Sequence, residues 1–211
     1  MIEILKHWID ILLHADNSLR ILVTDYKGGA YLILILIIFC ETGLVITPFL
    51  PGDSLLFAAG TVASGLGVLN IYLLLVLLFI AAFAGDNSNY LIGRYVGPKV
   101  LLRFIRKEYL ERTHNFYEKH GGQTLIIARF IPGVRTFAPF VAGVSIMNYR
   151  KFLAYCITGN LLWINIFLWA GYLLGREPWI QTHFSTVTII IIFISLLPAA
   201  YEFIRNKFSR K

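Results

Sequence analysis

Four ionisable side chains lie in apolar stretches of the chain. Glu41 and Asp53 stand in "FCETGLVITPFLPGDSLLFAAG", and Arg129 and Arg135 stand in "LIIARFIPGVRTFAPFVAG". A charge at the centre of a bilayer costs about 2.5–3.5 kcal/mol on insertion scales, so four unpaired charges would cost roughly 10–14 kcal/mol. Because the four formal charges sum to zero, opposing the two stretches would let each carboxylate face a guanidinium across a wet cavity.

These residue types suit the handling of phosphate and protons. The guanidinium fork of arginine binds two phosphate oxygens and stays charged, and a carboxylate in a low-dielectric cavity can load and release a proton near neutral pH. We therefore predict a proton-coupled carrier of an anionic head group, in which Arg129 and Arg135 bind the phosphate and Glu41 and Asp53 couple its movement to protons. The alternative is an ion-pair lock that only fixes the packing.

The backbone is interrupted beside these charges. Proline and glycine at mid-membrane depth free backbone polar groups, which is tolerable only inside protein or beside water. The apolar piece at 54–64 is also too short to cross a bilayer. We therefore predict two re-entrant hairpins, at about 41–64 and 123–143. Their predicted tips are Pro48, Pro51, Gly52, Pro132 and Gly133.

A short internal repeat relates the two hairpins. "FLPG" at 49–52 matches "FIPG" at 130–133, and each copy is followed by an apolar stretch that ends in Ala-Gly. With one full span between them, the copies would enter the membrane from opposite faces. Inverted repeats with broken helices that meet near the midplane are typical of secondary transporters.

The remaining apolar segments must hold these hairpins in a membrane. The chain is 57% hydrophobic and only 15% charged, against about 25% charged in soluble domains. We predict an all-α polytopic membrane protein, with four spanning helices, two opposed re-entrant hairpins related as an inverted repeat, and surface amphipathic helices. The predicted spans are about 30–47, 66–85, 152–175 and 185–204. The chain is predicted to consist of a surface helix and link at 1–28, one membrane domain at 29–205 and a basic tail at 206–211.

The net charge of +7 is best explained by membrane topology. Lys and Arg gather in the loop at 94–119 and in the tail, whereas the linker at 176–183 holds only Arg176. The positive-inside rule then places the loop and both termini in the cytoplasm. We expect no nucleic-acid partner, because no basic run is interleaved with stacking aromatics in a polar context.

Other polar residues have simpler explanations. Asp86, Asn89, Tyr90 and Arg94 are spaced to share one helical face at a membrane exit, where interfacial anchoring is favoured over an accessory contact with substrate. Asn160 and Trp163 lie within a predicted span and are expected to bond between helices.

Catalysis is not expected. All five histidines lie outside the apolar spans, and the chain has no GxSxG motif, zinc-ligand spacing or Walker loop. A lipid-phosphate hydrolase would need histidine near arginine in a pocket. We therefore predict no enzyme, no catalytic or metal-binding residue and no cofactor.

Several motifs in order resemble the bacterial DedA family over nearly the whole chain. They are "FCETGLVITPFLPGDSLLFAAG", "GDNSNYLIGRYVG", "FYEKHGG", "ARFIPGVRTFAPFVAG" and "GNLLW". The family is similar in its core to the SNARE-associated Golgi protein group of phospholipid scramblases. The resemblance implies transport of undecaprenyl phosphate in the bacterial inner membrane, dependent on the proton motive force. It also maps a functionally required acidic pair onto Glu41 and Asp53, and an arginine pair onto Arg129 and Arg135.

The expected partners are a lipid phosphate, protons and membrane lipids, and homo-oligomerisation stays open. Two other functions compete with lipid transport. A cation/proton antiporter would use the carboxylates but need no arginine pair, and an envelope scaffold would use the charges only to lock its fold.

Overall fold

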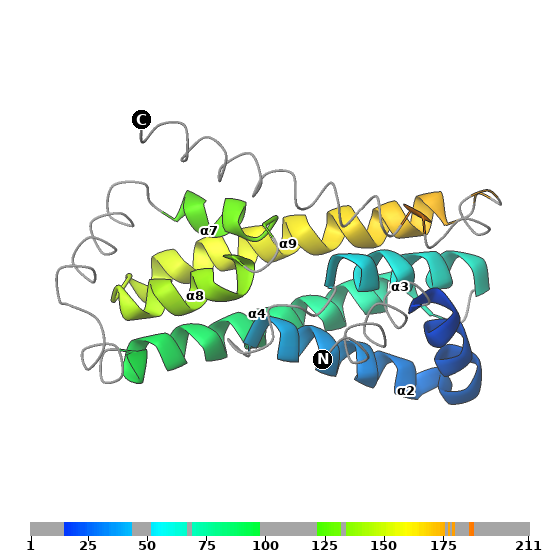
Figure 1. Cartoon of the computed structure of the whole chain (residues 1–211), viewed down its shortest axis with the longest axis horizontal. Helices are drawn as coiled ribbons and strands as arrows, with labels where there is room; N and C mark the ends of the chain where they lie inside the picture. Colours follow the sequence, from blue (N-terminus) through cyan, green and yellow to red (C-terminus); the bar gives the residue numbers. More distant parts are fainter. Residues whose placement is uncertain are drawn as a thin grey trace, which may run out of the picture. The chain divides into compact units, whose positions relative to one another are not determined.

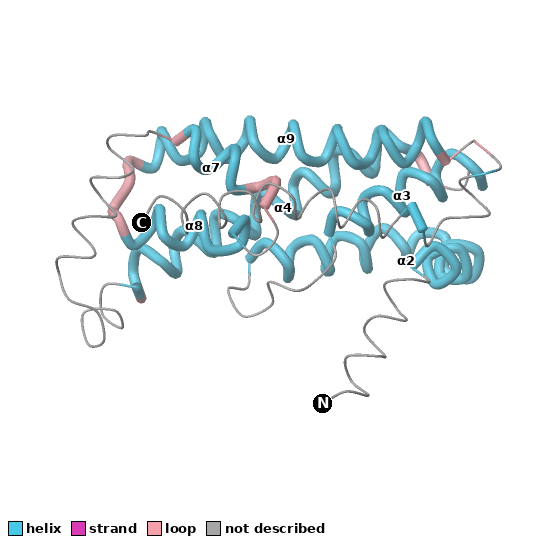
Figure 2. Tube along the Cα trace, turned by 45° about the horizontal axis from the view of Figure 1, so that its top comes forward, coloured by secondary structure: helices cyan, strands magenta, loops and turns pink. Residues whose placement is uncertain are grey.

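The described part of the chain is helical. The computed structural model describes residues 15–43, 52–66, 69–97, 122–131, 134–175, 177, 179 and 186–187, and none of these lies in a strand (Figure 2). The predicted all-α class is therefore confirmed over these residues. The helices are α2 (Ala15–Gly43), α3 (Gly52–Leu66), α4 (Ile71–Tyr95), α7 (Gln123–Ala128), α8 (Val134–Val144) and α9 (Tyr149–Leu174) (Figure 1).

Two of these helices are long and apolar enough to cross a membrane. They are α4, with 25 residues, and α9, with 26. At about 1.5 Å per residue each is roughly 38 Å long, more than the hydrocarbon core of about 30 Å. Two shorter apolar helical stretches are Gly29–Gly43, within α2, and α8. The predicted span at 185–204 lies almost wholly outside the described residues.

The end of α4 differs from the prediction. We expected a span to stop at about residue 85, where the polar run "GDNSNY" begins, but the helix continues to Tyr95. The side chains of Asp86 and Asn89 are buried. Asp86 and Asn89 therefore face other parts of the protein, and the helix does not end at this polar run.

Both long helices begin at an asparagine. Asn70 Oδ1 accepts hydrogen bonds from the N–H groups of Tyr72 (2.9 Å) and Leu73 (3.2 Å). Asn148 Oδ1 accepts them from Arg150 (3.0 Å) and Lys151 (3.4 Å). Such caps satisfy N–H groups that the first helical turn cannot pair, and so they fix where each helix starts.

The chain divides into two compact units. Unit 1 contains α2 up to Leu36, α3, α4 up to Leu78 and α9 from Ile164. Unit 2 contains α2 from Ile37, α4 from Phe79, α7, α8 and α9 up to Trp163.

In unit 1, α3 packs closely on α9. A Cβ built on Gly60 would collide with the backbone at Leu168 and Tyr172, and one built on Gly171 would collide with the backbone of Phe57. Next to this contact, Thr61 Oγ1 donates hydrogen bonds to the carbonyls of Phe57 (3.1 Å) and Gly171 (3.2 Å). Small residues allow two helix backbones to approach this closely.

Unit 2 contains the same contact, built from α8 and α4. A Cβ on Gly143 would collide with the backbone of Tyr90 and Arg94, and one on Gly93 would collide with the backbone of Phe140. In unit 1, the Ala-Gly of "FAAG" packs on the first glycine of the Gly-x-x-x-Gly motif at 171–175. In unit 2, the Ala-Gly of "FVAG" packs on the first glycine of the motif at 93–97. The sequence repeat is therefore accompanied by repeated helix packing.

The second predicted hairpin region contains two helices. The helices α7 and α8 are separated by a break at 129–133 and contact each other. Of the predicted tips, only Gly52 is described, as the first residue of α3; Pro48, Pro51, Pro132 and Gly133 lie outside the described residues. The helical assignment of α2 continues through 25–29, where we expected a polar link.

Candidate functional site

Glu41 and Arg135 form an ion pair in unit 2. Glu41 lies in the last turn of α2, and Arg135 is the second residue of α8. The two residues are 0% and 7% exposed. The guanidinium carbon of Arg135 also lies 5.1 Å from the ring centre of Trp163 on α9, within the range of a cation–π interaction. Three helices thus surround this pair.

Arg129 pairs with Asp86 and not with Asp53. Arg129 follows the last residue of α7, and Asp86 lies in the middle of α4. Asn160 on α9 joins them, because it accepts a hydrogen bond from Arg129 and donates one of 2.8 Å to Asp86 Oδ2. The thiol of Cys156 donates to the same oxygen over 3.2 Å. The prediction that Asn160 bonds between helices is confirmed.

Asn89 on α4 forms hydrogen bonds with the backbone of two other helices, α2 and α8. Its Nδ2 donates to the carbonyl of Thr42 (3.1 Å), near the end of α2, and to that of Thr136 (2.5 Å), near the start of α8. Asn89 is 0% exposed, and its Oδ1 accepts no hydrogen bond from the residues that the structure describes. A buried amide oxygen that makes no bond is costly, so this oxygen is a candidate acceptor for a hydrogen bond from a bound polar group.

A close approach of α2 and α4 positions Glu41. A Cβ on Gly85 would collide with Thr42 Oγ1 and with the backbone of Gly43. Without a side chain at Gly85, the end of α2 lies directly on α4, and Glu41 is held within reach of Arg135. A substitution at this glycine would separate the two helices.

Asp53 lies in the first turn of α3 and is 7% exposed. It belongs to unit 1, whereas Glu41, Arg129 and Arg135 belong to unit 2. Three of the four predicted site residues thus belong to unit 2, in which Asp86 is the carboxylate partner of Arg129. The role of Asp53 in proton coupling stays a prediction, as does that of Glu41.

The remaining accessory candidates lie further along α4. Tyr90 is buried and donates a hydrogen bond of 2.6 Å to the carbonyl of Met147. Arg94 is half-buried and donates one of 2.8 Å to Tyr90 Oη. Of the four accessory residues, Asp86, Asn89 and Tyr90 are thus buried, and their roles stay predictions.

Unit 2 contains two guanidinium groups that are each paired with a carboxylate. A phosphate and the ionised carboxylate would compete for the same guanidinium, and protonation of the carboxylate would favour binding of the phosphate. Asp86 was missed as a main partner because its polar run resembled the end of a span. The signal was its spacing to Asn89 and Tyr90, which puts the three on one helical face.

Comparison with known proteins places the chain in a family. The VTT domain matches residues 50–173. Protein DedA of Escherichia coli K12 is 50% identical over 97% of this chain and 96% of its own length. An uncharacterized membrane protein of Mycobacterium tuberculosis H37Rv is 42% identical over 79% and 75%, and inner membrane protein YqjA of Escherichia coli K12 is 37% identical over 72% and 70%.

No solved structure matches the chain. The relatives named as membrane proteins agree with the two apolar helices that are long enough to cross a bilayer. The match of the VTT domain and the identity to Protein DedA over almost the whole length lead to one conclusion: the chain is a membrane protein of the DedA family.

Proposed function

We propose that this protein carries a lipid phosphate across the bacterial inner membrane and couples the movement to protons. Undecaprenyl phosphate is the substrate that the family resemblance favours. The protein acts as a transporter and not as an enzyme, needs no cofactor, and has both termini in the cytoplasm. The relative YqjA, named as an inner membrane protein, supports this location.

One observation carries the proposal. Two arginines, 6% and 7% exposed, are paired with carboxylates in a unit that includes parts of two helices long enough to span a membrane. Apolar packing could hold these helices together without the desolvation of four charges. Exchange of the carboxylate for a phosphate at a guanidinium would explain why charged residues are buried here.

Transport is tested in proteoliposomes that contain the purified protein and labelled undecaprenyl phosphate. The informative variant is Arg135→Lys, with the exposed Lys151→Arg as a matched control. Lysine keeps the charge but cannot bind two oxygens at once. We expect Arg135→Lys to slow lipid movement at least tenfold, while Lys151→Arg remains within twofold of the wild type.

The competing functions give different results in the same vesicles. If Arg135→Lys transports normally and the wild type exchanges cations for protons, the protein is a cation/proton antiporter. A second candidate, the ion-pair lock of a scaffold, is favoured by the fact that both arginines already have carboxylate partners. In that case the wild type moves neither lipid nor ions, and Arg135→Lys only lowers the unfolding temperature.

A further inference from the structure

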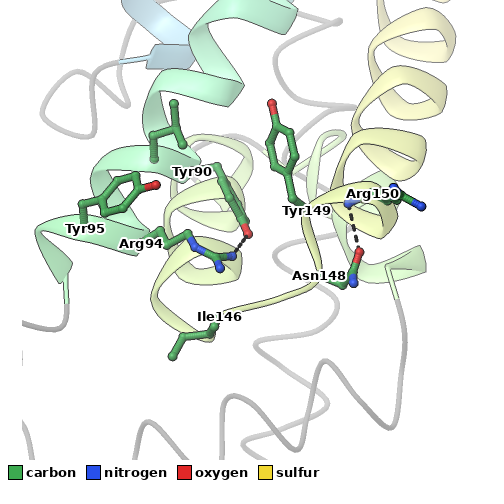
Figure 3. A pocket seen from close by; sticks show the side chains of 8 residues that line it. Tyr90, Arg94, Tyr95, Ile146, Asn148, Tyr149 and Arg150 are labelled. Carbon is green, nitrogen blue, oxygen red and sulfur yellow. Dashed lines mark hydrogen bonds between the residues drawn. The ribbon is translucent and has the colours of Figure 1, made fainter.

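A second polar site lies in unit 2, at the end of α4 and the beginning of α9 (Figure 3). It is a pocket of about 770 Å³. The helix α4 ends beside it and α9 begins beside it. It is lined by Tyr90, Leu91, Arg94, Tyr95, Ile146, Asn148, Tyr149 and Arg150.

The pocket is cationic. Among the described residues that line it, Arg94 and Arg150 are charged and none is acidic. Arg94 donates one hydrogen bond to Tyr90 Oη, which in turn donates to the carbonyl of Met147. Figure 3 shows the bond between Arg94 and Tyr90. A guanidinium has several further N–H groups with which to bind an anion. Arg94 and Arg150 have no carboxylate partner among the described residues, in contrast to Arg129 and Arg135.

The rim of the pocket is apolar and exposed. Leu91 is 41%, Tyr95 67% and Ile146 61% exposed. Tyrosine is enriched at the level of the lipid head groups, where its ring and its hydroxyl meet different surroundings. A cationic pocket beside an exposed apolar rim fits a ligand with a negative head and a hydrocarbon tail.

The backbone at Ile146 gives an independent indication. The helix α8 ends with hydrogen bonds from Met147 N–H to Ala142 O (3.1 Å) and from Ile146 N–H to Gly143 O (3.0 Å), the Schellman pattern in which glycine usually occupies the left-handed position. Here that position holds Ile146, with φ of 55°. A β-branched residue rarely adopts this conformation. A large apolar side chain therefore stands on the rim although the backbone favours glycine.

We propose that this pocket binds an anionic glycerophospholipid of the surrounding leaflet, with its phosphate on Arg94 and its acyl chains along Leu91, Tyr95 and Ile146. Arg150, at the start of α9, adds a second positive charge on the open side. The site is separate from the paired arginines of the transport proposal and does not depend on that proposal. The topology expected from the sequence assigns it to the cytoplasmic leaflet.

The test is a titration of the full-length protein in detergent with dioctanoyl phosphatidylglycerol, followed by native mass spectrometry. Dioctanoyl phosphatidylcholine and inorganic phosphate serve as the other ligands. We expect phosphatidylglycerol to bind at least tenfold more tightly than either. Arg94→Gln should weaken its binding at least tenfold and Arg150→Gln at least threefold, whereas Lys151→Gln, which removes an exposed charge outside the pocket, should change it less than twofold.

The variant Ile146→Gly distinguishes a loss of lipid binding at the pocket from a loss of folding. Glycine suits the left-handed backbone, so the unfolding temperature should stay the same or rise, while the affinity for phosphatidylglycerol should fall at least threefold. Equal affinity of all variants for phosphatidylglycerol would overturn the proposal. So would binding of inorganic phosphate as tight as that of the lipid, because the apolar rim would then contribute nothing.

Discussion

At the scale of the residue, the chain balances every arginine of its buried site with a carboxylate. Arg135 pairs with Glu41, and Arg129 pairs with Asp86, to which Asn160 also bonds. Removing one partner of a buried pair is expected to be far more costly than removing both, because a single partner leaves a charge without compensation.

The first prediction concerns Asp86. Asp86→Asn should lower the free energy of unfolding by about 3–5 kcal/mol, the usual cost of breaking a buried pair by removing one partner. The double variant Asp86→Leu with Arg129→Met should recover most of that loss. Ser88→Ala is the control, because Ser88 Oγ bonds to the carbonyl of Ala84 on the same helix, and it should change the stability by less than about 0.5 kcal/mol. Thermal unfolding in detergent measures all three.

If the double variant is no more stable than Asp86→Asn, apolar packing cannot replace the pair. The stability then depends on the hydrogen bonds of Asn160 and Cys156, and not on charge balance.

The residues of the site were predictable from the sequence as a class, but their pairing was not. Four charges in apolar stretches indicate a buried polar site, because such charges are rarely tolerated without a function. Which carboxylate meets which guanidinium depends on tertiary packing. Asp86 lies 43 residues before Arg129 in the sequence, and no local pattern connects them.

At the scale of the element, glycines decide how closely the helices pack. The repeat "FLPG"/"FIPG" correctly identified two related segments, and the structure adds that each is followed by an Ala-Gly that packs on a Gly-x-x-x-Gly helix. The sequence also predicted spans at 66–85 and 152–175, and α4 and α9 there are long and apolar enough to cross a membrane. It placed the end of α4 too early, because buried polar residues on a helix and polar residues at its end have the same composition.

The second prediction concerns these glycines. Gly60→Val and Gly143→Val should each lower the apparent unfolding temperature by several degrees or prevent folding, because a Cβ at either position collides with the backbone of the facing helix. Gly65→Ala on α3 and Phe137→Ala on α8 are the controls. Both positions are exposed, and surface substitutions usually change stability by less than about 0.5 kcal/mol. Wild-type unfolding temperatures for both valine variants would mean that the two helix pairs do not pack closely in the membrane.

At the scale of the whole molecule, the distribution of Lys and Arg along the sequence predicts the orientation in the membrane. The third prediction is that the loop at 94–119 faces the cytoplasm and the linker at 176–183 faces outward, as the positive-inside rule requires. In a background with Cys40→Ala and Cys156→Ser, Ile180→Cys should react with an impermeant thiol reagent on intact cells. Lys107→Cys should react only after the cells are opened. The reverse pattern would contradict this topology.

The proposed division of roles between the arginines and the carboxylates concerns the whole of the proposed transport cycle. A carboxylate that competes with phosphate for a guanidinium releases it when protonated, so the cycle requires the acid to change its charge while the arginine keeps its own. Glu41 contacts Arg135 directly, which makes this competition local. Asp53 lies in the other unit, and its contribution stays a prediction of the sequence.

The fourth prediction separates lipid binding from lipid movement. Glu41→Gln mimics the protonated acid, so this variant should bind undecaprenyl phosphate at least as tightly as the wild type, because a competing anion has been removed from Arg135. Asp53→Asn should also retain binding. Both variants should move the lipid slowly, and their rates should no longer depend on the proton gradient. Arg135→Gln, in contrast, should lose binding, because the phosphate and a carboxylate would then compete for the one remaining guanidinium, that of Arg129. Binding and movement are measured on the same purified proteins between about pH 6 and 8, a range in which a perturbed carboxylate can titrate. If the carboxylate variants lose binding as completely as Arg135→Gln does, the four charges act as one structural unit, and the ion pairs serve to hold α2, α4, α7 and α8 together.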